Sequence, residues 1–202
     1  MSFTDMFSNN DTSKIYGVVT AIVTNNQDPD KLGRVKVKFP WLSAKDESNW
    51  ARVASWMAGP AKGAFILPEV EDEVLVAFEH GDIARPYIMG SLWNGKDLPP
   101  EDNSNGENNI KRIQSRSGLT IDMDDKQGEE KILICDKEKK FKIEMSIKDK
   151  KISIISDKDI EYKAPQGKIS LEAKEIIMTS TADTKMEASG NVVIKGTKIE
   201  MN

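Results

Sequence analysis

The feature that most constrains this fold is a repeat of short alternating apolar segments from Ile143 onward. Within each segment apolar or small residues occupy every second position, and turn-forming residues such as those at 165–167 and 189–191 separate the segments. The first members of the segments lie 7 to 9 residues apart: Ile143, Ile152, Ile160, Ile169, Ile176, Thr184, Val192 and Ile199. Period-two alternation indicates strands, and a strand followed by a sharp turn about every eight residues predicts a β-solenoid.

One copy of this repeat cannot bury its own apolar residues. Each predicted strand offers two or three modest apolar side chains on one face and Lys, Glu or Ser on the other, too little for a two-sheet core. In three chains wound together, the apolar faces would point to a shared axis and the strand edges would pair between chains. The repeat therefore predicts a homotrimer.

The first hundred residues have a different composition. All four tryptophans precede residue 100, and a polar, turn-rich run at 99–109 reads as a linker. We therefore divide the chain into an N-terminal segment (1–14), a first domain (15–95), a linker (96–112) and the repeat domain (113–202).

The first domain reads as a small β-barrel. Residues 33–39 alternate strictly between an apolar and a basic face, which predicts a half-buried strand. Residues 59–63 read as a flexible loop. Further strands are predicted at 15–23, 50–54, 73–78 and 85–90. Short strands without a helical period fit a closed barrel of the oligonucleotide/oligosaccharide-binding (OB) kind, so the predicted fold class is all-β throughout.

Composition narrows the classes of function. The 29 basic and 33 acidic residues give a net charge of −4, which argues against a protein that binds a phosphate backbone. No apolar run is long enough to cross a bilayer, and the single cysteine, Cys135, cannot form an internal disulfide. Because the first residues also lack signal-peptide features, we expect synthesis in the cytoplasm.

No residue pattern points to catalysis, a cofactor or a metal. The only histidine, His80, is expected in a turn with a structural role, and Cys135 as a packing residue in a strand. An acidic cluster is expected to be a solvated turn rather than a cation site: Glu69, Glu71, Asp72 and Glu73. The group Asp122, Asp124 and Asp125 lacks the glycine and distal glutamate of a calcium loop. The tryptophans are expected in core or interface packing rather than in base stacking: Trp41, Trp50, Trp56 and Trp93.

Several separated motifs then resemble one family. Residues 32–41, 50–54, 67–78, 81–82 and 86–94 are similar, in order, to the OB domain of phage baseplate spike proteins of the baseplate assembly protein V type and of the VgrG spikes of type VI secretion systems. Glu71 stands where that family usually has glycine. Residues 113–132 resemble the start of the family's needle.

The resemblance implies a non-enzymatic central spike of a contractile injection machine. Three copies would form an OB collar and a trimeric β-helical needle, resident in a virion or injection-system baseplate. The collar would seat on a hub protein, helped by residues 2–13, and the needle would touch the target membrane only during puncture. Residues 94–110 leave no room for the lysozyme domain that some relatives insert.

The resemblance also suggests a separate tip. No histidine follows His80, so the iron-binding His-x-His apex of some spikes is missing, and a needle ending at Asn202 would expose strand edges. We expect a small tip protein of the PAAR-repeat type on the last repeat, the alternative being a bare end. Its predicted interface is Lys195, Gly196, Thr197, Lys198, Ile199, Glu200, Met201 and Asn202. The competing function is an OB nucleic-acid or carbohydrate binder with a β-repeat oligomerisation stalk.

Overall fold

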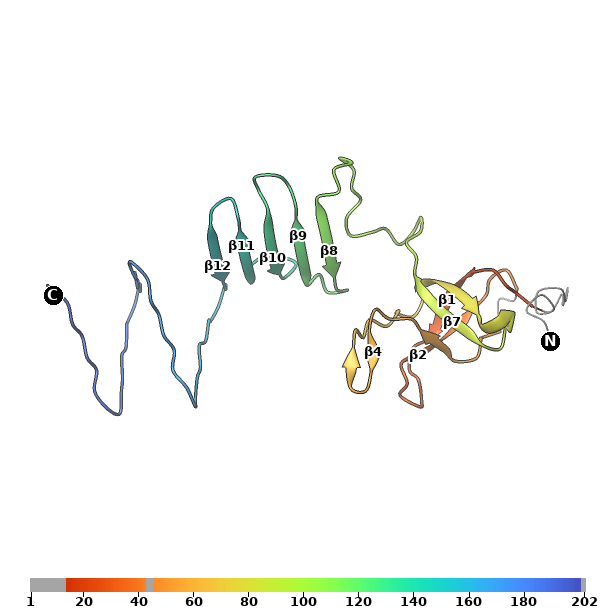
Figure 1. Ribbon diagram of the computed structural model, residues 1–202, viewed down its shortest axis with the longest axis horizontal. Coiled ribbons are helices and arrows are strands. Elements are labelled where there is room, and N and C mark those ends of the chain that lie inside the picture. The colour runs from red at the N-terminus through yellow and green to blue at the C-terminus, as the bar shows by residue number, and fades with distance from the viewer. Residues whose placement is uncertain (1–13, 43–45, 201–202) are drawn as a thin grey trace, which may run out of the picture.

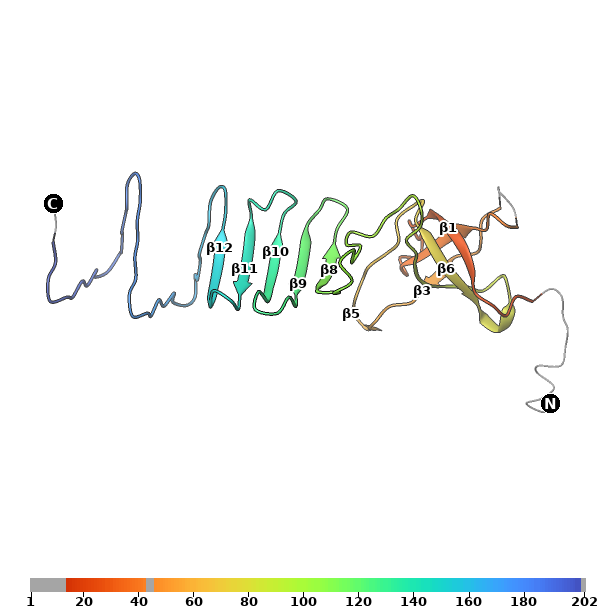
Figure 2. The same ribbon diagram turned by 90° about the horizontal axis from the view of Figure 1, so that it is seen from above.

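The computed structural model describes residues 14–42 and 46–200 and is all-β in architecture. Its only helical element in these ranges is a single 3₁₀ turn, η1 (Glu79–Gly81). Figure 1 shows a barrel at one end, a row of strands beside it, and a long extended segment running to the other end. The view from above in Figure 2 has the same order, so the molecule is elongated.

The barrel has the predicted OB architecture. Its strand order is β1-β2-β3-β7-β6, and β1 pairs with β6 to close it. The β3–β7 pair is parallel and the other pairs are antiparallel. The strands are β1 (Val19–Asn25), β2 (Arg34–Lys38), β3 (Ala51–Val53), β6 (Glu73–Phe78) and β7 (Pro86–Ser91).

The barrel core is built from small, mostly β-branched residues. The alternation predicted for 33–39 is confirmed, because Val35, Val37 and Phe39 point inward and the basic residues between them do not. The ten buried residues of the core are Ala21, Val23, Val35, Val37, Phe39, Ala51, Val74, Val76, Phe78 and Ile88. Burying each valine or isoleucine contributes about 1.5–3 kcal/mol, so this half of the chain has a core of its own.

Two expectations for the barrel were wrong in detail. The first strand begins at Val19 rather than at residue 15; Ile15 instead packs on the core and donates its N–H to the Gly81 carbonyl (2.9 Å). Residues 59–63 are not a flexible loop but belong to a hairpin of β4 (Ala58–Gly59) and β5 (Lys62–Gly63). None of the four tryptophans belongs to the buried core, so of their expected roles packing at an interface stays a prediction.

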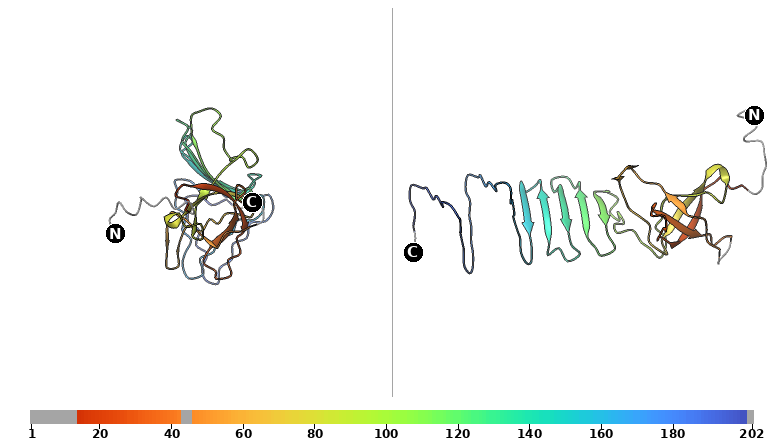
Figure 3. Two further views of the ribbon diagram at one scale, coloured as in Figure 1. Left: turned by 90° about the vertical axis from the view of Figure 1, so that its right-hand side faces the viewer. Right: turned by 90° about the horizontal axis from the view of Figure 1, so that it is seen from below.

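A second sheet follows the linker. Its order is β8-β9-β10-β11-β12, and every strand pairs antiparallel with its neighbour in sequence. The strands are β8 (Ile110–Gln114), β9 (Thr120–Asp124), β10 (Lys131–Cys135), β11 (Lys142–Ser146) and β12 (Lys151–Ile155). Figure 3 shows these strands side by side in one layer, with β8 beginning before the predicted start of the needle at 113.

Beyond β12 the eight-residue repeat persists without strands. Bends occur at 157–158, 165–167, 174, 181–182, 189–190 and 197, which is a corner about every eight residues. The segments between these corners are extended, and none of residues 156–200 pairs in a sheet. The predicted corner positions are therefore confirmed, whereas the predicted strands do not form within one chain.

Candidate interaction surfaces

One face of the β8–β12 sheet is apolar and uncovered. Cross-strand neighbours on this face are apolar in successive pairs, for example Ile134 with Ile121 and with Ile143. We call this set the apolar ladder, and its side chains are 41 to 67% exposed: Ile113, Ile121, Met123, Ile132, Ile134, Ile143, Met145, Ile152 and Ile154. Soluble monomers rarely leave a continuous apolar strip of this kind uncovered, which marks it as an interaction surface.

The opposite face of the same sheet is polar and satisfied within the chain. Arg112 donates two hydrogen bonds to the Asp122 carboxylate, from Nε (2.8 Å) and from Nη2 (2.7 Å), and Asp122 is only 8% exposed. The Asp122 carboxylate raises the pKa of the Arg112 guanidinium. Leu133 and Cys135 are buried on this face. The sheet thus covers its charged side better than its apolar side, the reverse of a water-soluble monomer.

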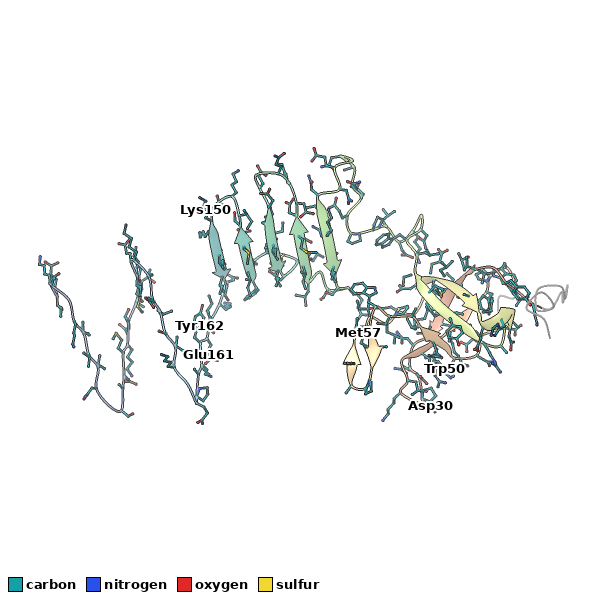
Figure 4. The ribbon with its side chains drawn as sticks, viewed as in Figure 1. Asp30, Trp50, Met57, Lys150, Glu161 and Tyr162 are labelled. Carbon is teal, nitrogen blue, oxygen red and sulfur yellow. The ribbon has the colours of Figure 1, made fainter. Side chains whose placement is uncertain are left out.

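The extended segment after β12 also has backbone groups and apolar side chains that nothing in this chain covers. Among described residues 156–200, the only backbone–backbone hydrogen bond joins the Gly167 N–H to the Ala164 carbonyl (3.1 Å). We call the extended stretches between its corners arms. Apolar side chains such as Tyr162, Leu171 and Met178 are exposed along these arms, and Figure 4 labels Tyr162 on one of them. Extended backbone with free edges and apolar side chains is a template for pairing with another chain.

The predicted tip interface lies in this segment. Residues 195–200 are all exposed, including the apolar side chain of Ile199, and Lys198 pairs with Glu200. Met201 and Asn202 lie outside the described residues. The structure presents residues 195–200 as an extended, exposed segment.

The outer face of β2 carries the basic strip that an OB nucleic-acid binder would use. Arg34 and Lys36 lie over the Trp50 ring, 5.8 and 5.5 Å from its centroid. Each cation also has an acidic partner: Arg34 with Asp28 and Asp30, Lys36 with Glu47, and Lys38 with Glu71. Because its positive charge is already neutralised, this strip is a poor surface for a phosphate backbone.

Asp28 organises the loop between β1 and β2. Its side chain, 3% exposed, accepts hydrogen bonds from the Arg34 Nε (2.8 Å) and Nη2 (2.7 Å) atoms. The backbone N–H groups of Asp30, Leu32 and Arg34 also donate to it. The Arg34 guanidinium and these N–H groups hold the pKa of the Asp28 carboxyl well below its usual range. These contacts cross-link the loop; Figure 4 labels Asp30 within it and Trp50 nearby.

The acidic turn at 69–73 makes contacts with the rest of the chain rather than a cation site. Asp72 accepts the Glu69 N–H (2.8 Å), Glu73 accepts from the Asn94 amide (2.8 Å), and Glu69 pairs with Arg116. Glu71 adopts φ +76°, the left-handed conformation that the family's usual glycine would favour.

The remaining titratable residues singled out from the sequence also lie apart from any site. Asp122, Asp124 and Asp125 each pair with a cation: Arg112, Lys131 and Lys111. His80 is exposed within η1, at φ +50°. Within 14–42 and 46–200, no three or more His, Cys, Asp or Glu side chains are grouped so as to hold a metal ion.

Sequence reasoning missed one surface, which we call the hairpin patch. Its side chains are 55 to 84% exposed and gather around the β4–β5 hairpin: Leu32, Trp56, Met57, Phe65 and Ile66. The available signal was charge, since residues 56–66 contain one charged residue, Lys62, in a chain that is 31% charged. Interface cores are depleted of charge and enriched in aromatic residues and methionine, as this segment is.

Comparison with known proteins identifies the barrel. Residues 19–93 match the family described as the type VI secretion system/phage-baseplate injector OB domain. The barrel therefore belongs to this injector OB-domain family, and the chain is similar to VgrG-like baseplate spikes. This match spans β1 to β7, so the closed barrel described above is that domain.

Curated relatives of this VgrG-like chain are type VI secretion spikes. It is 33% identical over 135 residues to the spike protein VgrG1c of Pseudomonas aeruginosa, covering 59% of this chain and 19% of that one. The P. aeruginosa spike protein VgrG1a is 34% identical over 135 residues, with 59 and 21% covered. The Vibrio cholerae spike protein VgrG3 is 40% identical over 75 residues, with 35 and 7% covered.

The aligned part of the chain thus spans about a fifth of the length of its P. aeruginosa relatives.

The described residues include no helix that is long and apolar enough to cross a membrane.

Proposed function

We propose that this chain is the central spike of a contractile injection machine, acting as a homotrimer whose OB barrels form a collar and whose β8–β12 sheets and following repeats form a needle. The observation that carries this proposal is the apolar ladder, a sheet face with nothing over it in one chain. Its relatives named as spike proteins support the same role.

The exposed area supports an obligate oligomer. One chain exposes 17308 Å² at a mass of 22.5 kDa. A compact monomer of that mass would expose about 9,500 Å². Many of the exposed large apolar side chains lie in the apolar ladder and in the extended segment after β12. Obligate interfaces commonly bury about 2,000–5,000 Å² or more, so oligomerisation is the natural way to remove this excess.

Threefold assembly suits the two faces of the sheet. With the apolar ladder turned to a common axis, the paired charges of the opposite face, such as Arg112 with Asp122, stay on the outside. The extended arms of each chain would then find backbone partners in the other two. Function would rest on stiffness, because the contracting machine supplies the force and the needle transmits it.

The proposal also includes partners at both ends. A baseplate hub would hold the collar, with residues 2–13, which lie outside the described residues, as an additional contact. At the other end, a small PAAR-type tip protein would cover residues 195–202. The exposure of Ile194 and Ile199 supports this, since exposed apolar side chains mark a surface that a partner can cover. Deleting 195–202 should abolish tip binding and leave the trimer intact; persistent binding would exclude this interface.

The proposed role is structural and non-enzymatic. The cations of β2 are paired, the acidic turn is engaged by Arg116, Asn94 and its own backbone, and His80 lies exposed on the surface. These placements agree with a chain whose work is mechanical.

The direct test of the proposed role is deletion of the chain's gene in the cell that carries it. We expect contractile particles to fail to assemble or to inject, and expression of the intact chain in trans to restore them. Injection at the normal level without the chain would contradict the proposal. The complemented strain controls for effects on neighbouring genes.

A further inference from the structure

The β4–β5 hairpin is ordered although it has no core beneath it. The Ser55 hydroxyl donates to the carbonyls of Ala64 (2.7 Å) and Met57 (3.1 Å), and the Ala64 N–H donates to Met57 as well (3.0 Å). Gly63 lies so close that a Cβ there would stand 2.5 Å from the Met57 carbonyl oxygen, at φ +149°. A hairpin held this firmly, with its apolar side chains in solvent, is shaped for a contact outside its own chain.

The hairpin patch borders an open groove. A groove of about 640 Å³ runs between the hairpin and the end of the β1–β2 loop, lined by Leu32, Met57, Phe65 and Ile66. The Phe65 ring lies against Gly33, where a Cβ would come within 3.3 Å of it. Lys31 and Lys62 also line the groove. Its remaining large side chains are apolar, so its wall favours an occupant that is mainly apolar.

The position of the hairpin identifies the occupant. Figures 1 and 2 both show β4 and β5 on the side of the barrel that faces β8. At this junction Arg116, in the β8–β9 turn, pairs with Glu69, which follows Ile66 by three residues. Leu119, exposed in the same turn, leads into Ile121 of the apolar ladder. The hairpin patch therefore lies on the side of the barrel from which the apolar ladder continues.

From this continuity we infer that the hairpin patch packs against a second copy of the chain and extends the shared core from the needle into the barrel ring. The inference rests on the proposed trimer. Other copies of the chain would surround the barrel–needle junction in that assembly. Trp56, Met57 and Phe65 of each copy would then close the upper end of the needle core against water.

Thiol labelling tests this contact. In a Cys135→Ala background, Met57→Cys places one thiol in the hairpin patch, and Lys96→Cys places a control thiol on an exposed turn outside it. Light scattering gives the mass of each variant, and the rate of maleimide labelling gives the access to its thiol. We expect both variants to be trimeric, with Met57→Cys reacting at least tenfold more slowly than Lys96→Cys and at the same rate in denaturant.

The two other possible results of this labelling experiment contradict the hairpin contact in different ways. A trimer whose two thiols react at equal rates overturns the hairpin contact and leaves the proposed spike trimer standing, with the patch free for a partner of another kind. A monomer overturns both. Slow labelling cannot come from the chain itself, because Met57 is 55% exposed in a single copy.

Discussion

Glu71 carries a backbone conformation that its side chain disfavours. It lies at φ +76°, and its ion pair with Lys38 is long (3.8 Å) and exposed. Replacing Glu71 by glycine should raise the free energy of unfolding by about 1 kcal/mol, since the strain of a left-handed non-glycine residue is removed and an exposed pair is worth little. Denaturant melts followed by tryptophan fluorescence measure this. Glu71→Ala keeps the Cβ and loses the same pair, so a gain equal to that of glycine would exclude the strain argument.

Asp28 should make the barrel sensitive to acid. Its carboxyl pKa is lowered in the folded chain by Arg34 and by backbone N–H groups, so it stabilises the folded state wherever it is ionised in both states, above its unfolded pKa of about 3.9. That stabilisation is lost as the pH falls below about 4. We therefore expect Asp28→Asn to melt earlier than the native chain at pH 7, and the two melting temperatures to converge toward pH 2. A constant difference across this range would contradict the assignment.

Within the sheet, the Arg112–Asp122 pair tests whether the polar face is held together inside one chain. Arg112→Met leaves a carboxylate that is 8% exposed without its partner and should cost about 2 kcal/mol of stability. Asp122→Leu should cost a similar amount. The double variant should recover part of the loss, because no charge is then left unpaired. Additive losses in this double-mutant cycle would show that the two residues are not coupled.

The two faces of the sheet should respond differently to the same substitution. Ile143 is 48% exposed in one chain, so Ile143→Glu would be nearly neutral if the chain were a monomer. In the proposed trimer it places three carboxylates in a shared apolar core, and we expect the trimer to be lost. Lys151→Glu puts a carboxylate on the opposite face and is the matched control. Size-exclusion chromatography with light scattering distinguishes the two; an intact Ile143→Glu trimer would disprove the assigned interface.

The sequence predicted strands and turns correctly where their formation depends only on residues close by in the chain. Alternation at 33–39 placed β2, and the turn residues at 157–158, 165–167 and 189–191 placed corners, because both follow from local chemistry. The strands expected after residue 156 depend on partners from other chains, so one chain shows the corners without the ladders. The hairpin patch was missed because a stretch with two glycines, Gly59 and Gly63, is also typical of a flexible loop. Only the folded barrel shows that Trp56 and Phe65 lie together beside a groove.

At the scale of the whole molecule, the two halves of the chain bury their apolar residues in different ways. The barrel closes a core of ten residues by itself, and its family match covers that same region. The remainder has an apolar face and extended arms that one chain leaves open, which makes physical sense as one third of a shared structure. The barrel should therefore fold even where the trimer is broken. In Ile143→Glu the barrel should still unfold in a cooperative denaturant transition followed by circular dichroism; loss of that transition would contradict this division.

The molar mass of the purified chain in solution tests the central claim most directly. Multi-angle light scattering behind size exclusion should give a stable mass of three times 22.5 kDa that persists on dilution to nanomolar concentration. A clean monomer at micromolar concentration would contradict the shared needle, and with it the proposed role of the chain as a spike.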